Sequence, residues 1–229
     1  RRPLPLKLNP MPHLIFDMDG TIIDSMPVHR SSWAQFAARY GLSEQAEELE
    51  RATSGRTGVE GMRALFGAEL PLELAQAYVH EKEALYREQF GAQFRWVGGF
   101  ERFALRARSL GLRCGLGTAG DRHNVRFCLE RLPRPDLDGL FEVCVGGDEG
   151  LPGKPDPAIF LAVAQRMGVA PADCLVFEDS PAGIAAAGNA GMRAIALLTS
   201  HSAEELAGPH VLAAVPDYDA LLASPHCPF

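Results

Sequence analysis

The chain has 229 residues, of which 47% are hydrophobic and 22% charged, and these proportions are typical of a globular protein with a substantial core. A formal net charge of -7 and the lack of any block of Lys and Arg argue against a surface that follows a nucleic-acid backbone. No run reaches the roughly 18 apolar residues that a membrane-spanning helix needs. The five cysteines include no C-x-x-C pair, which favours buried thiols in a reducing, cytoplasmic environment.

The first predicted element is a short strand, residues 14–16, which follows a proline-rich segment at residues 1–10 that we expect to be a flexible tail. The strand has no polar residue for a solvent-exposed face, which is typical of a parallel sheet covered on both sides. It ends in Asp17 and Asp19, and because alternate residues of a strand share a face, both carboxylates are expected to point towards one spot beyond the sheet. Like charges that close repel unless a cation or a proton lies between them. The alternative is a polar turn in which one Asp caps the next helix.

Residues 26 to 94 contain four predicted helices and no strand. The first ends before Gly41, and the next three are expected over residues 43–52, 58–66 and 72–89. The last helix has an amphipathic register, in which one face carries Leu74, Ala77, Tyr78, Glu81, Leu85 and Tyr86. A helical segment between two strands predicts a separate lobe, and we expect this lobe to comprise residues 26–97.

From residue 98 onward, predicted strands alternate with helices of about ten to fifteen residues. Strands are expected over residues 113–118, 141–145, 174–177, 194–198 and 211–215, and helices over residues 100–110, 121–132, 156–168 and 180–191. This alternation predicts right-handed βαβ units and a Rossmann-like parallel sheet. The expected architecture is an α/β core, residues 11–25 and 98–229, with an inserted α-helical cap.

Two further strand ends or loops carry polar residues of chemical interest. Thr118 follows an apolar strand and precedes a helix, where a hydroxyl and free backbone N–H groups suit a phosphate; a plain helix N-cap is the alternative. Lys154 lies in a loop whose flanking prolines hold its backbone firmly. A fixed ammonium beside a phosphate and a carboxylate nucleophile would stabilise charge in phosphoryl transfer, and a solvated loop lysine is the alternative.

The strand at residues 174–177 ends in a second acidic pair, Glu178 and Asp179. In a parallel sheet, this pair points to the same crevice as Asp17 and Asp19. Carboxylates gathered with little positive charge suit a hard cation with oxygen ligands, and Mg²⁺ is the expected one. A purely structural cation site would use the same residues.

Together these positions match a known pattern. The chain resembles haloacid dehalogenase-superfamily phosphohydrolases over residues 14–198, on the motifs Asp17-Met18-Asp19-Gly20-Thr21, Thr118, Gly153-Lys154-Pro155 and Glu178-Asp179. The sequences around the first and last motifs, residues 16–25 and 177–184, look most like the branch of β-phosphoglucomutases and small sugar-phosphate phosphatases. That branch carries a helical cap inserted after the first strand, in agreement with the lobe expected at residues 26–97.

The resemblance implies a role for each of these residues. Asp17 would attack phosphorus and form an aspartyl-phosphate, and Asp19 would protonate the leaving oxygen and then activate water. Mg²⁺ would be held by Asp17, the Asp19 backbone carbonyl and Asp179. Glu178 would be an outer-shell or water-mediated ligand of the metal. Substrate would be bound in part by Gly20, Thr118, Ala119 and Lys154.

The cap is expected to contribute two further residues to substrate binding. His29 stands where this branch often has a histidine near the substrate, and Arg56 is the guanidinium of a cap loop; each has a plain surface residue as its alternative. A phosphosugar mutase needs cap cations for a second phosphate, but Ser54 and Gly58 occupy the positions where the resemblance would put them. This departure favours hydrolysis. Trp33 is assigned to packing within the cap.

The sequence thus predicts a Mg²⁺-dependent phosphatase for a small phosphorylated metabolite, a sugar phosphate, that works without nucleic acid or membrane. A β-phosphoglucomutase-type mutase is the alternative enzyme. A phospho-acceptor module would need neither a cap nor the acid at Asp19, and a catalytically silent scaffold would not need the intact acidic residues. Neither the identity of the sugar nor the oligomeric state follows from the sequence.

Overall fold

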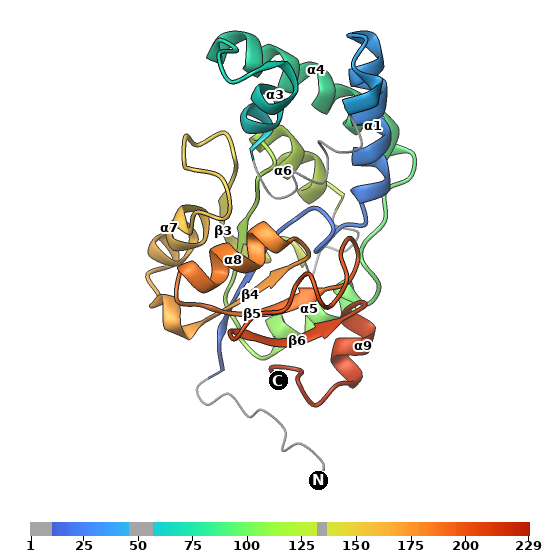
Figure 1. Ribbon diagram of the computed structural model, residues 1–229. Coiled ribbons are helices and arrows are strands. Elements are labelled where there is room, and N and C mark those ends of the chain that lie inside the picture. Colours follow the sequence, from blue (N-terminus) through green and yellow to red (C-terminus); the bar gives the residue numbers. More distant parts are fainter. Residues whose placement is uncertain (1–10, 46–56, 132–136) are drawn as a thin grey trace.

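The computed structural model describes residues 11–45, 57–131 and 137–229, so the predicted tail at residues 1–10 lies outside it. A six-stranded sheet forms its centre, and every neighbouring pair of strands is parallel, in the order β3-β2-β1-β4-β5-β6 (Figure 1). The strands are β1 (His13–Phe16), β2 (Cys114–Gly117), β3 (Phe141–Val145), β4 (Cys174–Glu178), β5 (Arg193–Leu197) and β6 (Val211–Val215). The predicted α/β fold with a Rossmann-like parallel sheet is confirmed.

Helices cover both faces of this sheet, as β1 illustrates. Leu14 and Phe16 pack on one face and Ile15 on the other, and all three side chains are buried. The first face is covered by α5 (Phe100–Ser109), α6 (Arg122–Leu129) and α9 (Tyr218–Ala223), and the second by α7 (Ala158–Met167) and α8 (Pro181–Asn189). Because neither face of β1 is wet, the strand is apolar throughout. Its central position brings its carboxyl end between those of β2 and β4.

Three helices between β1 and α5 lie together beyond the carboxyl ends of the strands (Figure 1). They are α1 (Met26–Arg39), α3 (Gly58–Phe66) and α4 (Leu72–Gly91). A small apolar core of their own holds them together, with Phe36, Met62, Ala75 and Leu85 at its centre. Of the helix predicted at residues 43–52, the structure describes a 3₁₀ turn, η1 (Ser43–Gln45), and residues 46–52 lie outside the described ranges.

The predicted register of α4 is confirmed in part, because Tyr78, Leu85 and Tyr86 pack against apolar residues. The prediction placed Leu74, Ala77 and Glu81 on the packed face, but Leu74 is 41% exposed. The buried residues are Ala75, Lys82, Leu85, Tyr86 and Phe90. The apolar face thus includes a lysine that is only 2% exposed, because that face borders a pocket as well as the core. Within the described ranges, no helix combines the length and apolarity needed to cross a membrane.

Capping residues mark several helix ends of the core. Ser180 accepts a backbone N–H at 3.1 Å and caps α8, and Gly168 ends α7 with φ 67°. The Asp-Pro pair at the start of the helix expected over residues 156–168 would make Asp156 its N-cap, but Pro157 holds that position in α7. Asp156 instead accepts the Ala158 N–H at 2.9 Å. The short helix α9, of six residues, is absent from the sequence prediction.

Candidate active site

A tight turn after β1 places the first two carboxylates, Asp17 and Asp19. The Gly20 N–H donates to the Ile23 carbonyl at 2.8 Å, so the chain folds back directly after the strand. Gly20 has φ +74°, and a Cβ at this position would lie 2.1 Å from the Asp179 carboxylate. Glycine is the residue that combines this backbone with so close an approach. The role of Gly20 in substrate binding stays a prediction, since its N–H is used within the turn.

Lys154 lies against Asp17 in the interior of the core. Its Nζ donates to Asp17 Oδ1 at 2.6 Å and to Glu178 Oε1 at 2.5 Å, and all three side chains are buried. This excludes the alternative of a solvated loop lysine. Burial raises the pKa of Asp17 to about 7, because Lys154 only partly offsets it and Glu178 adds repulsion. Burial lowers the pKa of Lys154, but its two carboxylate partners outweigh burial and hold it above its ordinary value.

Both oxygens of Glu178 are engaged. Oε1 accepts from Lys154, and Oε2 accepts the backbone N–H groups of Asp179 at 2.8 Å and Ser180 at 2.7 Å. The Ser180 hydroxyl donates to the same oxygen at 2.9 Å. These bonds favour a role for Glu178 in holding Lys154 next to Asp17, and its outer-shell contact with a metal stays a prediction.

Replacing Lys154 by Met is expected to lower the free energy of unfolding by about 3 to 5 kcal/mol, because Asp17 and Glu178 would stay buried without their cation. Urea unfolding in a buffer without Mg²⁺ measures the loss. The double variant Lys154→Met/Glu178→Gln should recover part of it, because one of the two unpaired carboxylates is removed. A loss below about 1 kcal/mol, the range of surface ion pairs, would contradict this account of the buried cluster.

Thr118 lies at the carboxyl end of β2 and is 1% exposed. Its Oγ1 accepts the Gly120 N–H at 3.0 Å. It is not the N-cap of α6, because Asp121 holds that position and accepts the Asn124 N–H at 2.8 Å. The structure therefore excludes the N-cap alternative and places Thr118 beside Ala119 in the wall of a pocket.

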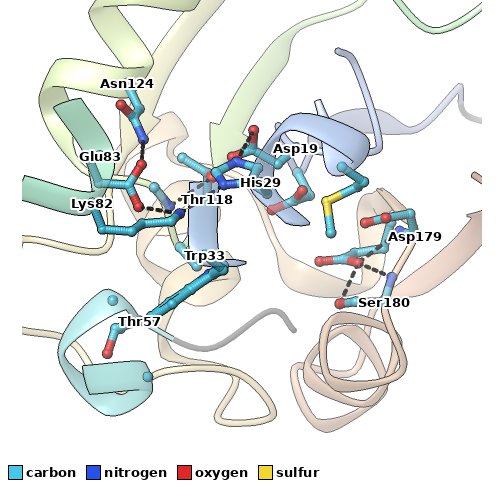
Figure 2. A pocket seen from close by; sticks show the side chains of 17 residues that line it. Asp19, His29, Trp33, Thr57, Lys82, Glu83, Thr118, Asn124, Asp179 and Ser180 are labelled. Carbon is cyan, nitrogen blue, oxygen red and sulfur yellow. Dashed lines mark hydrogen bonds and ion pairs between the residues drawn. The ribbon is translucent and has the colours of Figure 1, made fainter. Parts of the chain in front are cut away.

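This pocket has a volume of about 120 Å³ and lies between the strand ends and the helices α1, α3 and α4 (Figure 2). Core residues that line it include Asp17, Asp19, Thr118, Ala119, Glu178 and Asp179. Facing them are Met26, His29, Trp33, Lys82 and Glu83. Residues predicted from three distant stretches of sequence, around Asp17, Thr118 and Asp179, thus meet at one cavity. Arg56, predicted to bind substrate, lies outside the described residues, as does Ser54.

Three side chains converge on Asp19. Its Oδ1 accepts the Ser25 hydroxyl at 2.6 Å and the Tyr86 hydroxyl at 3.2 Å, and lies 3.0 Å from His29 Nε2. Burial raises the pKa of Asp19, but His29, Ser25 and Lys82 outweigh it and lower the pKa to about 2. His29 is therefore not a helix-surface residue, because it stacks on the Tyr86 ring at 3.9 Å and points at Asp19 (Figure 2).

Lys82, Glu83 and Asn124 are pocket residues that the sequence did not predict. Lys82 Nζ lies 3.0 Å from His29 Nδ1 and 2.9 Å from Glu83 Oε1. Asn124, on α6, donates to Glu83 Oε2 at 2.7 Å. The sequence held one signal for this group. Lys82 lies four residues from both Tyr78 and Tyr86, on the same face of a predicted helix, and a lysine on an apolar face needs a polar or charged partner. Trp33 packs partly in the cap, as predicted, but it also lines the pocket below Lys82.

The donor set at the strand ends fits Mg²⁺. Burial and the neighbouring carboxylates raise the pKa of Asp179 well above its ordinary value, and the pKa of Asp17 is raised as well. Ionising both carboxyls is therefore unfavourable unless a further positive charge lies beside them. In the part of the chain that the structure describes, no three carboxylate, imidazole or thiolate groups form a metal cage by themselves. Mg²⁺ does not need one, because it usually binds one or two protein carboxylates and completes its shell with water and substrate oxygens.

Comparisons with known proteins agree with this site. Residues 11–191 match the model of the haloacid dehalogenase-like hydrolase family. A phosphorylated carbohydrates phosphatase of Thermotoga maritima is 34% identical over 188 residues, which are 81% of this chain and 84% of that protein. A fructose-1-phosphate phosphatase of Escherichia coli is 35% identical over 187 residues, which are 80% of this chain and 94% of that protein.

A solved structure has the same fold over nearly the whole chain. It is a haloacid dehalogenase-type hydrolase of Entamoeba histolytica, with a TM-score of 0.79 and 26% identity, and the match covers 91% of this chain and 94% of that one. The family match includes Asp17, Thr118, Lys154 and Asp179. The chain belongs to the haloacid dehalogenase-like hydrolase family.

Proposed function

We propose that the protein is a Mg²⁺-dependent phosphatase that hydrolyses a small sugar phosphate through an aspartyl-phosphate on Asp17. The observation that carries the proposal is the position of Asp17 and Asp19 on one turn at a pocket of about 120 Å³, with Lys154 Nζ 2.6 Å from Asp17. The two carboxylates have different partners, because Lys154 contacts Asp17 whereas His29, Ser25 and Tyr86 contact Asp19, and this suits a division of labour between them. The names of the Thermotoga and Escherichia relatives support a phosphorylated carbohydrate as the substrate.

In the first step, the Asp17 carboxylate attacks phosphorus, and the bond between phosphorus and the sugar oxygen breaks. Lys154 offsets charge on Asp17 and on the phosphate oxygens, and the Thr118 hydroxyl donates to one of those oxygens. Asp19 gives its proton to the leaving oxygen. A phosphate dianion beside Asp19 opposes the effect of His29 and Lys82 and raises the proton affinity of the carboxyl, which prepares it to act as an acid.

In the second step, the ionised Asp19 takes a proton from water, which attacks the phosphorus of the aspartyl-phosphate and frees Asp17. When held by Asp17, Asp179 and the Asp19 backbone carbonyl, Mg²⁺ supplies positive charge that offsets the repulsion between the nucleophile and the phosphate. Glu178 keeps Lys154 in place during both steps.

We assign residues 26–97 to a cap domain and residues 11–25 and 98–229 to the core. His29 and Lys82 come from the cap and complete the surroundings of Asp19 in the core. Cap and core together therefore set the protonation of the acid, and a closed cap also keeps bulk water from the phosphate.

The test is phosphate release from a panel of sugar monophosphates, each assayed with Mg²⁺ and with EDTA. Fructose 1-phosphate and glucose 6-phosphate belong in the panel beside 4-nitrophenyl phosphate. We expect release that depends on Mg²⁺ and prefers one sugar ester over the aryl ester. Folded protein that releases no phosphate from any ester would contradict the proposal and favour a phospho-acceptor or a scaffold.

Stabilisation by Mg²⁺ should depend on pH. In the folded protein without metal, the pKa of the Asp17 carboxyl is raised from 3.8 to about 7. The protonated carboxyl therefore stabilises the fold fully at pH values below 3.8, and this stabilisation is lost as the pH rises through about 7. Mg²⁺ binds the ionised carboxylates and must displace a proton at low pH. The rise in Tm on adding Mg²⁺ should thus be larger at about pH 8 than at about pH 5. Asp179→Asn should reduce the rise at the higher pH, and an equal rise at both pH values would be evidence against this site.

A further inference from the structure

Four side chains of the cap segment face the core across the pocket, and we call His29, Trp33, Lys82 and Glu83 the cap wall. Glu83 is held from two sides. Its Oε1 lies 2.9 Å from Lys82 Nζ, and its Oε2 accepts the Asn124 amide at 2.7 Å. Asn124 is 1% exposed and its own carbonyl oxygen accepts from Arg87 Nη1 at 2.8 Å. The carboxylate is therefore fixed at the pocket surface by residues of both α4 and α6 (Figure 2).

The cap wall carries one positive and one negative group in direct contact. Lys82 is already shared between His29 Nδ1 and Glu83, and its Nζ lies 5.0 Å above the Trp33 ring. Burial raises the pKa of Glu83, but Lys82 and His29 outweigh burial and lower it, so the group is a carboxylate at neutral pH. A second phosphate placed here would meet an ionised carboxylate and a lysine whose charge is already paired.

A sugar hydroxyl would find a better partner at the same place. A carboxylate accepts several hydrogen bonds, and among the described residues each Glu83 oxygen has one donor, which leaves capacity for hydroxyl donors. Hydrogen bonds from hydroxyls to a charged acceptor are the stronger kind. A carboxylate repels a second phosphate, so it weakens the binding of a bisphosphate more than it changes the binding of a monophosphate.

We propose that Glu83, held by Asn124 and Lys82, determines specificity by accepting hydroxyl groups of the leaving sugar and rejecting a second phosphate. This inference rests on the proposed function, because it places the sugar of a phosphate ester against the cap wall. The preferred substrate is then a monophosphate of a polyhydroxylated compound, and a bisphosphate is disfavoured.

Binding is measured separately from turnover, in Asp17→Asn protein with Mg²⁺, by calorimetric titration with fructose 1-phosphate, fructose 1,6-bisphosphate and ethyl phosphate. With Glu83 present, we expect the monophosphate to bind more tightly than the bisphosphate and than the ester without hydroxyls. Adding Glu83→Gln should shift the ratio of the two sugar affinities towards the bisphosphate by about tenfold or more. The matched control is Glu81→Gln, which removes the same charge from α4 where it pairs with Arg39 and Tyr40 outside the pocket.

A ratio that does not change with Glu83→Gln, or changes as much with Glu81→Gln, would overturn the proposal. Tighter binding of the bisphosphate by protein that retains Glu83 would overturn it without any cap variant, and so would equal binding of ethyl phosphate. The outcome is separable from the proposed function. Wild-type protein that releases no phosphate contradicts the phosphatase, whereas an active phosphatase with an unchanged ratio contradicts only the role of Glu83.

Discussion

Asp17→Asn is expected to lower phosphate release by at least about a thousandfold, because an amide cannot take the place of the carboxylate that attacks phosphorus. The side chain keeps its size, and Lys154 keeps Glu178 as a partner at 2.5 Å, so the variant should fold. Steady-state release from the preferred sugar phosphate measures the effect, and circular dichroism checks the fold.

The control is Asp24→Asn, which removes a carboxylate from the same loop. Asp24 pairs with Arg95 at 2.6 Å on the surface, away from the pocket. The Asp24→Asn variant should therefore keep nearly full activity. An Asp17→Asn protein with more than about a tenth of wild-type activity would rule out Asp17 as the nucleophile.

Asp19→Asn is expected to lower kcat for the sugar phosphate by about 100- to 10,000-fold, the usual contribution of a general acid and base. The reason is that a sugar oxygen leaves slowly without a proton, and that water then attacks without a base. 4-Nitrophenyl phosphate separates the two steps, because its leaving group needs no proton. The variant should release a burst of 4-nitrophenol equal to the enzyme, followed by slow turnover.

A stopped-flow trace shows this burst directly. Acid quenching at its end should trap a phosphoryl group on the peptide that contains Asp17. If Asp19→Asn lost turnover of both substrates equally and gave no burst, Asp19 would not act as the base in the second step, and the assignment of roles would be wrong.

Much of the fold follows from local pattern in the sequence. The apolar run at Leu14 and Phe16 could be assigned to a parallel strand because both of its faces are buried, and the strand ends that carry Asp17, Thr118 and Asp179 meet because parallel strands end at one edge. Helix α3 has the bounds that its glycine and apolar spacing predict.

The cap side of the site could not be predicted in the same way. Lys82 meets His29 across 53 residues of sequence, and Glu83 meets Asn124 across 41. Such pairs depend on how α1 and α4 pack together and on how α6 approaches α4, and no local pattern encodes this. The packed face of α4 was predicted only in part for the same reason, because a buried Lys82 contradicts the rule that polar residues lie on the solvent-exposed face.

The contacts of Glu178 are a second feature that the sequence pattern does not contain. An acidic pair at a strand end suits a cation, but position alone does not show which hydrogen bonds Glu178 and Asp179 make. The hydrogen bonds separate them, because Glu178 accepts from Lys154 and from two backbone N–H groups, while Asp179 packs against Gly20 beside Asp17.

Hydrolysis and phosphoryl return are told apart by the fate of the phosphoryl group of β-glucose 1-phosphate in one reaction with wild-type protein and Mg²⁺. Free phosphate and glucose 6-phosphate are measured together over time. We expect phosphate to appear in step with the loss of substrate and no glucose 6-phosphate to form, because water takes the phosphoryl group from Asp17. Accumulation of glucose 6-phosphate with little free phosphate would contradict this expectation, because the phosphoryl group would then return to a sugar held against the cap wall.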